Sequence, residues 1–262
     1  MNILDKILAT KRVELDRNSK IRVFEDIFEE AKSVTRPALS FIRALYDSEN
    51  HIIAEFKRRS PSKGFFNAEA EVETIVGGYS STGAAAISVL TDNDYFGGSL
   101  NDLAVARKVS AVPLLRKDFI IDPYQICEAR IAGADVVLLI AAVMTPDRCA
   151  ELAEFARSLN LEVLLEIHNK QELKYLNPFV NAVGVNNRDL TTFVTDVSIS
   201  YKLAPMIPDN FLKISESGIS SVSTLKGLQN AGFKGFLMGE NFMKEPDPVE
   251  TLKKFLSANL DN

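Results

Sequence analysis

The sequence predicts an α/β fold, a closed (β/α)8 barrel with an N-terminal helical extension, for this 262-residue chain. From about residue 50 onward, short aliphatic and β-branched runs alternate with longer amphipathic stretches, which indicates parallel strands joined by helices. The runs are apolar almost throughout, so both faces of the sheet should be covered. Eight such units in roughly 200 residues have the size of a TIM barrel. We therefore expect one barrel domain over residues 1–262, with residues 1–49 as its helical extension.

Eight segments are the expected strands, at 51–58, 84–91, 112–119, 135–142, 162–167, 182–187, 213–218 and 235–239. Helices are expected between them, at 69–81, 99–109, 122–133 and 145–160. Ser or Thr at the start, Pro in the first turn and Gly at the end support several of these helices. The main alternative is an open doubly wound sheet, which usually carries a Gly-rich dinucleotide loop after its first strand. Here that loop reads KRRSPSKG and lacks G-x-G-x-x-G, which favours the barrel.

The residues before the first strand indicate three further helices, at 2–17, 21–34 and 39–47. Apolar stripes run along the first two of them, through Ile3, Leu4, Ile7 and Leu8 and through Val23, Phe24, Ile27 and Phe28. Two interpretations stay open. The extension either covers one end of the barrel as a structural element or forms a lid over the mouth of the active site.

Composition argues against several classes of protein. The net charge of −5 and a pI near 5.3 argue against nucleic-acid binding, which usually requires a basic excess. Cys127 and Cys149 have no metal-type spacing and histidine occurs only at positions 51 and 168, so no metal site is expected. Two free thiols fit a reducing, cytoplasmic environment. The longest apolar run, around 136–143, is too short to span a bilayer, so no membrane partner is expected.

Several predicted strands end in charged or polar residues. In a barrel, alternate residues of each strand point inward and catalytic groups lie at the carboxyl ends. This alternation, or parity, predicts that seven polar residues face one cavity: Glu55, Lys57, Lys117, Glu166, Asn186, Ser215 and Ser217. By the same rule Glu216 falls on the opposite face. One buried ion pair has a structural explanation, but charges from several strands at one end of a cavity indicate a functional site, because unpaired buried charges are costly.

Glycines after the last two predicted strands indicate an anion site. The segments SESGISS and MGENF place Gly218 and Gly239 at the expected starts of helices. Backbone N–H groups at helix N-termini bind phosphate, and the loops after strands seven and eight of such barrels often do so. Tight turns alone would also explain two glycines, but this pair of positions favours a phosphate site.

These motifs are similar to those of one enzyme family. AEFKRRSPSKG, LLRKDFIIDPYQI, LLEIHN, GVNNRDL, ISESGI and FLMGENFM occur in this order and resemble indole-3-glycerol-phosphate synthase, from about residue 3 to 257. K-R-x-S-P-S and L-L-x-K-D-F are specific, whereas SESGI alone is not. The resemblance implies a carboxy-lyase of tryptophan biosynthesis that converts 1-(2-carboxyphenylamino)-1-deoxyribulose 5-phosphate to indole-3-glycerol phosphate, carbon dioxide and water. It implies a phosphorylated small-molecule substrate, no cofactor, and a monomer or weak homodimer.

The resemblance also implies catalytic roles. Lys117 is the expected general acid, which protonates the carbonyl oxygen as the ring carbon attacks the ketone. We expect burial beside other cations to lower the pKa of Lys117 toward neutrality. Lys57, Glu55 and Glu166 are expected to share the acid and base tasks of dehydration, with no division among them, and two carboxylates in one cavity often have split pKa values.

Further residues are implied as ligands of the substrate. Asn186 is expected to hold the substrate hydroxyls, and with Ser217 it completes the catalytic set. The other implied substrate-binding residues are Ser60, Pro61, Phe96, Phe119, Leu138 (or its neighbour Leu139), Arg188 and Glu216. The implied phosphate loop consists of Ser217, Gly218, Gly239 and Glu240.

Three polar residues near this set are interpreted differently. Glu240 stands where some relatives have Ser, so we expect its carboxylate to turn outward, away from the phosphate. His168 falls just after a strand and is interpreted as a structural or surface residue. Parity points Arg58 away from the cavity.

Two other functions stay open. The phosphoribosylanthranilate isomerase family uses a Cys at the end of strand one, whereas this strand ends in Glu55–Phe56–Lys57. A non-catalytic barrel that only binds a phosphorylated ligand would be expected to lose its acid and base residues, and all of them are present here.

Overall fold

Eight parallel strands close into a barrel in the part of the chain that the computed structural model describes, residues 2–65 and 67–260. Round the barrel the order is β1-β10-β9-β8-β7-β6-β5-β4. The strands are β1 (Ile52–Phe56), β4 (Ala86–Leu90), β5 (Leu114–Lys117), β6 (Val136–Ile140), β7 (Glu162–Ile167), β8 (Ala182–Asn186), β9 (Leu212–Glu216) and β10 (Gly235–Met238). Each predicted strand segment overlaps one of these strands, and seven of the eight contain theirs in full, so the predicted barrel is confirmed. Residues 1, 66 and 261–262, which the single-domain prediction also covered, lie outside the described residues.

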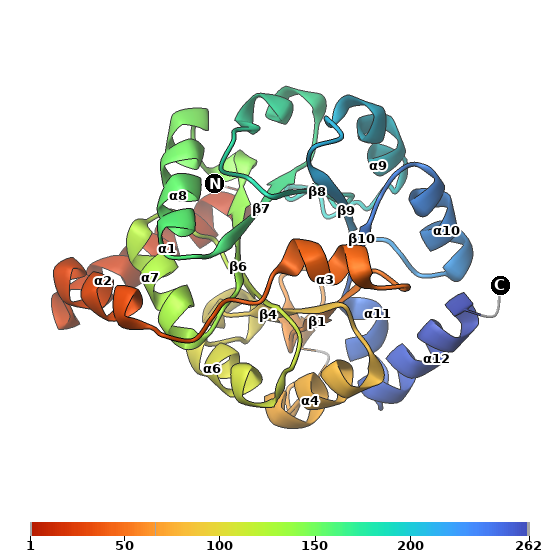
Figure 1. Ribbon diagram of the computed structural model, residues 1–262, viewed down its shortest axis with the longest axis horizontal. Helices are drawn as coiled ribbons and strands as arrows, with labels where there is room; N and C mark the ends of the chain where they lie inside the picture. Colours follow the sequence, from red (N-terminus) through yellow and green to blue (C-terminus); the bar gives the residue numbers. More distant parts are fainter. Residues whose placement is uncertain (1, 66, 261–262) are drawn as a thin grey trace.

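Helices follow the strands and surround the barrel (Figure 1). They are α4 (Val72–Thr82), α6 (Leu100–Val109), α7 (Pro123–Ala132), α8 (Pro146–Ser158), α9 (Ser198–Leu203), α10 (Val222–Asn230) and α12 (Pro248–Leu260). After β7 the chain forms a 3-10 helix, η2 (Lys170–Tyr175), in place of a longer helix. Short helices complete the connections: α5 (Asn93–Phe96), η1 (Ala141–Val143), η3 (Ala204–Met206) and α11 (Glu240–Met243).

Capping residues set where several helices begin. Asp122 accepts a backbone hydrogen bond at the start of α7, Pro123 lies in its first turn, and Gly133 ends it. Thr145 and Ser99 cap α8 and α6 in the same way. The sequence predicted these positions because a side-chain oxygen satisfies N–H groups that have no partner within the helix.

The alternation of side chains along the strands creates two apolar cores. Outward-facing residues such as Val137 and Leu165 pack against the surrounding helices. Inward-facing residues such as Leu115, Leu164 and Leu237 fill the barrel itself. The outer core covers the back of the sheet, and the inner core supports the residues at the strand ends.

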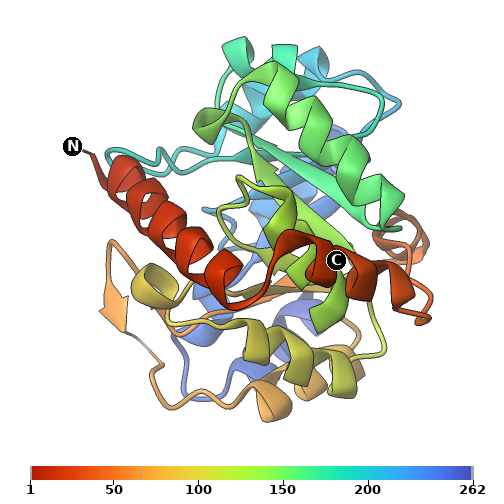
Figure 2. The same ribbon diagram turned by 90° about the vertical axis from the view of Figure 1, so that its left-hand side faces the viewer.

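The N-terminal extension covers both ends of the barrel. It consists of α1 (Ile3–Ile21), α2 (Phe24–Ser33) and α3 (Phe41–Asp47). Helix α3 crosses the end that faces the viewer in Figure 1, and its fully buried Phe41 and Leu45 join the inner core. Helix α1 lies at the other end, where Ile7 joins the same core (Figure 2). Helix α3 therefore covers one end of the barrel, as the structural interpretation expects, and α1 lies at the other end, where the lid stays a prediction.

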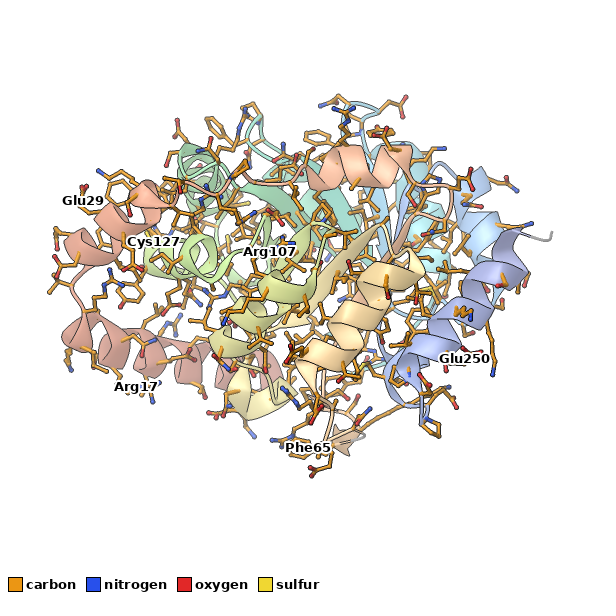
Figure 3. The ribbon with its side chains drawn as sticks, turned by 60° about the horizontal axis from the view of Figure 1, so that its bottom comes forward. Arg17, Glu29, Phe65, Arg107, Cys127 and Glu250 are labelled. Atoms are coloured by element: carbon orange, nitrogen blue, oxygen red, sulfur yellow. The ribbon has the colours of Figure 1, made fainter. Side chains whose placement is uncertain are left out.

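The loop after β1 forms a small hairpin that was not predicted, β2 (Arg59–Ser60) with β3 (Gly64–Phe65). It projects from the edge of the molecule, and Phe65 is 57% exposed there (Figure 3). Elsewhere, Cys127 and Cys149 are free, as expected, and both are buried. Among the described residues, no helix has the length and hydropathy that a membrane span requires.

A buried ion cluster fixes α1 to the barrel. The Lys11 side chain is 1% exposed, and its Nζ lies 3.1 Å from Asp92 Oδ2 and 3.0 Å from Asp118 Oδ1. Asp92 follows β4 and Asp118 follows β5, while Glu14 of α1 adds a contact at 2.9 Å. Burial opposes the charge on Lys11, but these carboxylates outweigh it and raise the pKa of Lys11 above its usual range.

Lys11→Met should lower the free energy of unfolding by about 3–5 kcal/mol, because breaking a buried pair leaves uncompensated charge. Asp92 and Asp118 would lose their shared cation. Urea unfolding followed by circular dichroism at pH 7 measures the change. Lys20→Met on the same helix is the matched control, since the Lys20 side chain is 71% exposed and should matter little. Equally small effects of both substitutions would contradict the anchoring role of Lys11.

Candidate active site

A cavity of about 350 Å³ opens at the carboxyl ends of the barrel strands. Every residue that the resemblance assigned to catalysis or binding lines it, whereas Ser215, which parity placed on the cavity face, does not. The lining residues so assigned are Glu55, Lys57, Ser60, Pro61, Phe96, Lys117, Phe119, Leu138, Glu166, Asn186, Arg188, Glu216, Ser217, Gly218, Gly239 and Glu240. Helix α1 adds Ile3, Leu4 and Ile7 to the lining. The extension is therefore part of the wall of this cavity.

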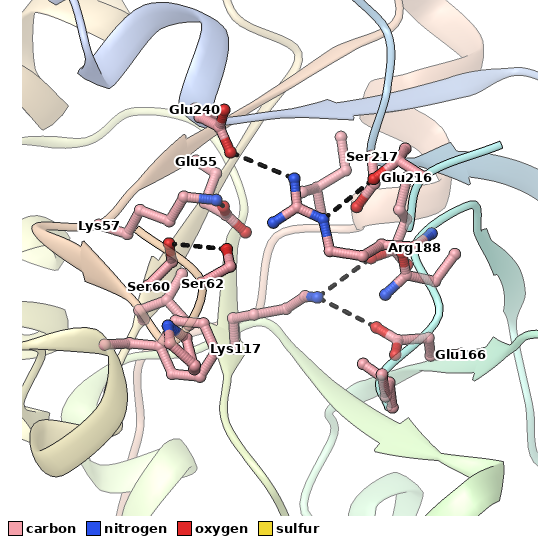
Figure 4. Close-up of a pocket in the computed structure, with 18 of the residues that line it drawn as sticks. Glu55, Lys57, Ser60, Ser62, Lys117, Glu166, Arg188, Glu216, Ser217 and Glu240 are labelled. Carbon is pink, nitrogen blue, oxygen red and sulfur yellow. Dashed lines mark hydrogen bonds and ion pairs between the residues drawn. The ribbon is translucent and has the colours of Figure 1, made fainter. Parts of the chain in front are cut away.

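Lys117 is at the centre of the charged residues in the cavity (Figure 4). Its Nζ lies 3.1 Å from Glu166 Oε2 and 3.1 Å from Glu216 Oε2. Lys117 ends β5 and Glu216 ends β9, on the far side of the barrel in the strand order, so the lysine reaches across the cavity. One cation thus joins three strands.

A second ion pair lies on β1 and just after it. Lys57 Nζ is 2.6 Å from Glu55 Oε1, and both side chains are largely buried. A Cβ at Gly239 would approach that carboxylate oxygen to 2.4 Å. The missing side chain at Gly239 therefore makes room for Glu55.

The pKa of Lys117 differs from the expectation. Burial disfavours its charge, but Glu166, Glu216 and Glu55 outweigh burial and raise the pKa of Lys117 above its usual range. The expectation of a pKa lowered toward neutrality is wrong, because carboxylates rather than cations surround the ammonium. Lys117 therefore carries a proton throughout the physiological pH range.

Two glutamates on either side of Lys117 have opposite pKa shifts. Burial opposes ionisation of Glu166, but Lys117 and His168 outweigh it and hold the pKa of Glu166 below its usual range. Burial raises the pKa of Glu216 to about 7; Lys117 counteracts this and Glu166 adds to it. Glu216 Oε1 has no hydrogen-bond partner among the described residues. A split of pKa values therefore separates Glu166 from Glu216, whereas the split expected from the sequence was between Glu55 and Glu166.

One side of the cavity is apolar. Phe96 follows β4 and Phe119 follows β5, with ring centroids 6.2 Å apart. Leu138 of β6 lines the same cavity, whereas Leu139 faces the outer core. With Ile3 and Leu4 of α1, these side chains form a slot suited to a flat apolar ring.

The loops after β8, β9 and β10 form the side across from this slot in the strand order. Gly239 precedes α11, as predicted, but Gly218 precedes Ser221, the cap of α10, by three residues and does not begin a helix. The prediction for Gly218 is therefore wrong in its local structure, although Gly218 still lines the cavity.

Glu240 does not turn outward. It lines the cavity and accepts hydrogen bonds from Lys63 and from Arg188 Nη2, the latter at 3.2 Å. The two cations remove the repulsion on which the outward prediction depended. Together they hold the pKa of Glu240 below its usual range, although burial acts in the opposite direction.

Parity was wrong for β9. Ile214 belongs to the inner core, so Glu216 faces inward with it, and Glu216 pairs in register with Asn186. Ser215 faces outward and contacts Ser200 and Asn187. Ser217 nevertheless reaches the cavity because its φ of +67° bends the chain out of the strand.

Sequence reasoning missed two residues at this site. Lys63 reaches Glu240 from the hairpin loop. His168 is half-buried, which agrees with the structural rather than the surface interpretation, and its Nε2 lies 3.2 Å from Glu166 Oε1. The only sequence signal for His168 was its position two residues after Glu166. Arg58 lies outside the cavity, as predicted, and pairs with Asp102 at 2.7 Å.

Comparison with known proteins gives a consistent result. A family model described as indole-3-glycerol phosphate synthase matches residues 4–255. A protein of that name from Bacteroides thetaiotaomicron is 51% identical over 257 residues, covering 98% of each chain. Another from Aliarcobacter butzleri is 40% identical, covering 97% of this chain and 98% of its own. A solved chain of the tryptophan synthase complex from Pyrococcus furiosus shares the fold at 14% identity, with a TM-score of 0.62 over 82% of this chain and 99% of that chain.

The raised pKa of Glu216 predicts a pH-dependent stability. The pKa of Glu216 is about 7 in the folded protein, above its ordinary value of 4.5. Glu216 therefore contributes fully to folding stability below pH 4.5, and this contribution is lost as pH rises through 7. The wild-type free energy of unfolding should therefore fall, relative to Glu216→Gln, by roughly 3 kcal/mol between these limits. Urea titrations of both proteins at several pH values measure this difference. Glu73→Gln, at an exposed position of α4, is the control, and a difference between wild type and Glu216→Gln that does not change with pH would contradict the shift.

Proposed function

The chain belongs to the indole-3-glycerol phosphate synthase family, and from this premise we propose that it converts 1-(2-carboxyphenylamino)-1-deoxyribulose 5-phosphate to indole-3-glycerol phosphate. Carbon dioxide and water are the other products. The observation that carries the proposal is Lys117 held between two glutamates, with an apolar slot on one side and cation-rich loops on the other. This order matches a substrate with an aromatic ring at one end and a phosphate at the other.

Ring closure is the step assigned to Lys117. The ring carbon that bears the carboxylate attacks the ketone carbon, and the carbonyl electron pair moves to oxygen. Lys117 donates a proton to that oxygen as the charge develops. Its raised pKa is compatible with this role because the alkoxide formed is a stronger base than the amine. The bond to the carboxylate then breaks, carbon dioxide leaves, and the ring regains its aromaticity.

Dehydration needs a second acid and a base. Lys57, paired with Glu55, is positioned to protonate the departing hydroxyl, and Glu166 is ionised and available as a base. Asn186 lies beside Glu166 and is proposed to orient the substrate hydroxyls. The hydroxyl leaves as water, and removal of a proton completes the indole.

The two ends of the substrate are proposed to bind in different ways. Ser60 and Pro61, with Phe96, Phe119 and Leu138, are assigned to the anthranilate ring and its carboxylate. Backbone groups of Ser217, Gly218 and Gly239 are assigned to the phosphate, beside Arg188 and Lys63, the two cations that contact Glu240. We also propose that this protein is cytoplasmic and acts as a monomer or weak homodimer.

Lys117→Ala should lower kcat by about a thousandfold or more, because it removes the proton donor of the first chemical step. Substrate binding should persist, since apolar and phosphate contacts remain. Indole fluorescence measures turnover with little background, because the chain contains no Trp, and calorimetry measures binding. Lys108→Ala, on the exposed face of α6, is the control. A near-normal rate for Lys117→Ala would reject this assignment, and no indole from the wild type would favour a non-catalytic barrel.

Glu240→Ser should lower KM by about fivefold with little change in kcat, because one carboxylate beside the phosphate loop is removed. Arg188 and Lys63 would then be free to face the phosphate. Steady-state kinetics measure both constants. Glu250→Ser on α12, far from the cavity lining, is the matched control. A raised KM for Glu240→Ser would mean that the carboxylate supports binding and would contradict this account.

A further inference from the structure

His168 lies directly behind one of the glutamates of the cavity. It follows β7, its side chain is 13% exposed, and it is not among the described residues that line the cavity. Its Nε2 lies 3.2 Å from Glu166 Oε1, and its Nδ1 lies 3.4 Å from Glu172 Oε2. The Nε2 approach is an ion-pair contact rather than a well-aligned hydrogen bond. The imidazole is therefore between two carboxylates.

The second carboxylate is fixed by the turn that follows β7. Glu172 Oε2 accepts a hydrogen bond from the His168 backbone N–H at 2.6 Å, and Oε1 accepts from Asn169 Nδ2 at 2.9 Å. A neutral imidazole would present a lone pair to one of the two carboxylates. Only the imidazolium presents N–H groups to both, so this geometry selects the charged form.

Glu166 consequently has a cation on each oxygen. Oε2 contacts Lys117 and Oε1 contacts His168. Glu216 contacts the same lysine through Oε2, but its Oε1 has no hydrogen-bond partner in the described residues. Both glutamates thus contact Lys117, and Glu166 alone of the two also contacts His168.

We propose that His168 is a positioning residue of the indole-forming reaction, which keeps Glu166 ionised and aimed at Lys117 and so makes Glu166 the base. Glu216, which has only the contact with Lys117 in the described part of the chain, is then the carboxylate of the pair that becomes protonated first as pH falls. The role rests on the proposed function. It goes beyond that function because it gives a role to His168, which lies outside the described cavity lining, and explains why Glu166 and Glu216 differ although both contact Lys117.

The charged groups around His168 support this role. They are Glu166 on β7, Glu172 on η2 and Asp189 in the turn after β8, all of them acidic. Burial disfavours the imidazolium, but contacts with Glu166 and Glu172 outweigh burial and raise the pKa of His168 to about 10. His168 should therefore stay charged across the working range of the enzyme.

A titration by NMR tests the charge directly and does not depend on activity. The chain has two histidines, so a His51→Asn variant assigns the remaining imidazole signal to His168. Asn suits position 51, where φ is +57°. We expect His168 to titrate at least about two pH units above the ordinary value near 6.5, and Glu172→Gln to lower that midpoint. A midpoint at or below 6.5 would overturn the proposal.

Kinetics of two variants test the role in catalysis. His168→Phe removes both N–H groups and should lower kcat roughly tenfold to a hundredfold with little change in KM. The acid limb of its kcat profile should move to higher pH, because Glu166 loses a cation. His168→Gln retains an N–H donor and should recover part of kcat. An unchanged kcat and acid limb in His168→Phe, in an enzyme that makes indole, would overturn the role of His168 alone. Absence of product from the wild type would overturn the proposed function, and the role built on it, whatever the titration gives.

Discussion

The contact of Lys117 with Glu166 and Glu216 is the constraint on which the rest of the structure depends. Any of these charges, buried alone, would cost several kcal/mol, so the three must meet. Strands β5, β7 and β9 therefore have to end at the same level in the barrel. The inner core sets that level, because each charged residue follows by two positions a fully buried apolar one: Leu115, Leu164 and Ile214.

The neighbours of Lys117 connect this contact to the N-terminal extension. Asp118, the residue after Lys117, binds Lys11 of α1 at 3.0 Å and Arg116 at 3.1 Å. One short segment thus directs a cation into the cavity and anchors the helix that borders it. The end of β5 thus sets both the position of Lys117 in the cavity and the position of α1 over its mouth.

Much of this arrangement follows from the sequence because regular strands obey parity. Glu55, Lys117 and Glu166 lie where alternation predicts. Parity was wrong on β9, where apolar Ile214 and not Ser215 marks the inner face, and a positive φ at Ser217 breaks the pattern. The pKa of Lys117 was predicted with the wrong sign because sequence gives no distances between strands. Contacts such as Lys63 with Glu240 depend on loop conformation, which periodicity does not encode.

Two glycines leave space that the carboxylates occupy. A Cβ at Gly184 would lie 2.2 Å from Glu216 Oε1, just as one at Gly239 would lie 2.4 Å from Glu55 Oε1. Neither glycine can mutate to alanine while its glutamate stays in place. Each glycine and its glutamate therefore form an epistatic pair, in which the glutamate has to change before the glycine can. Libraries that recruit this barrel for new reactions should randomise each glycine together with its glutamate.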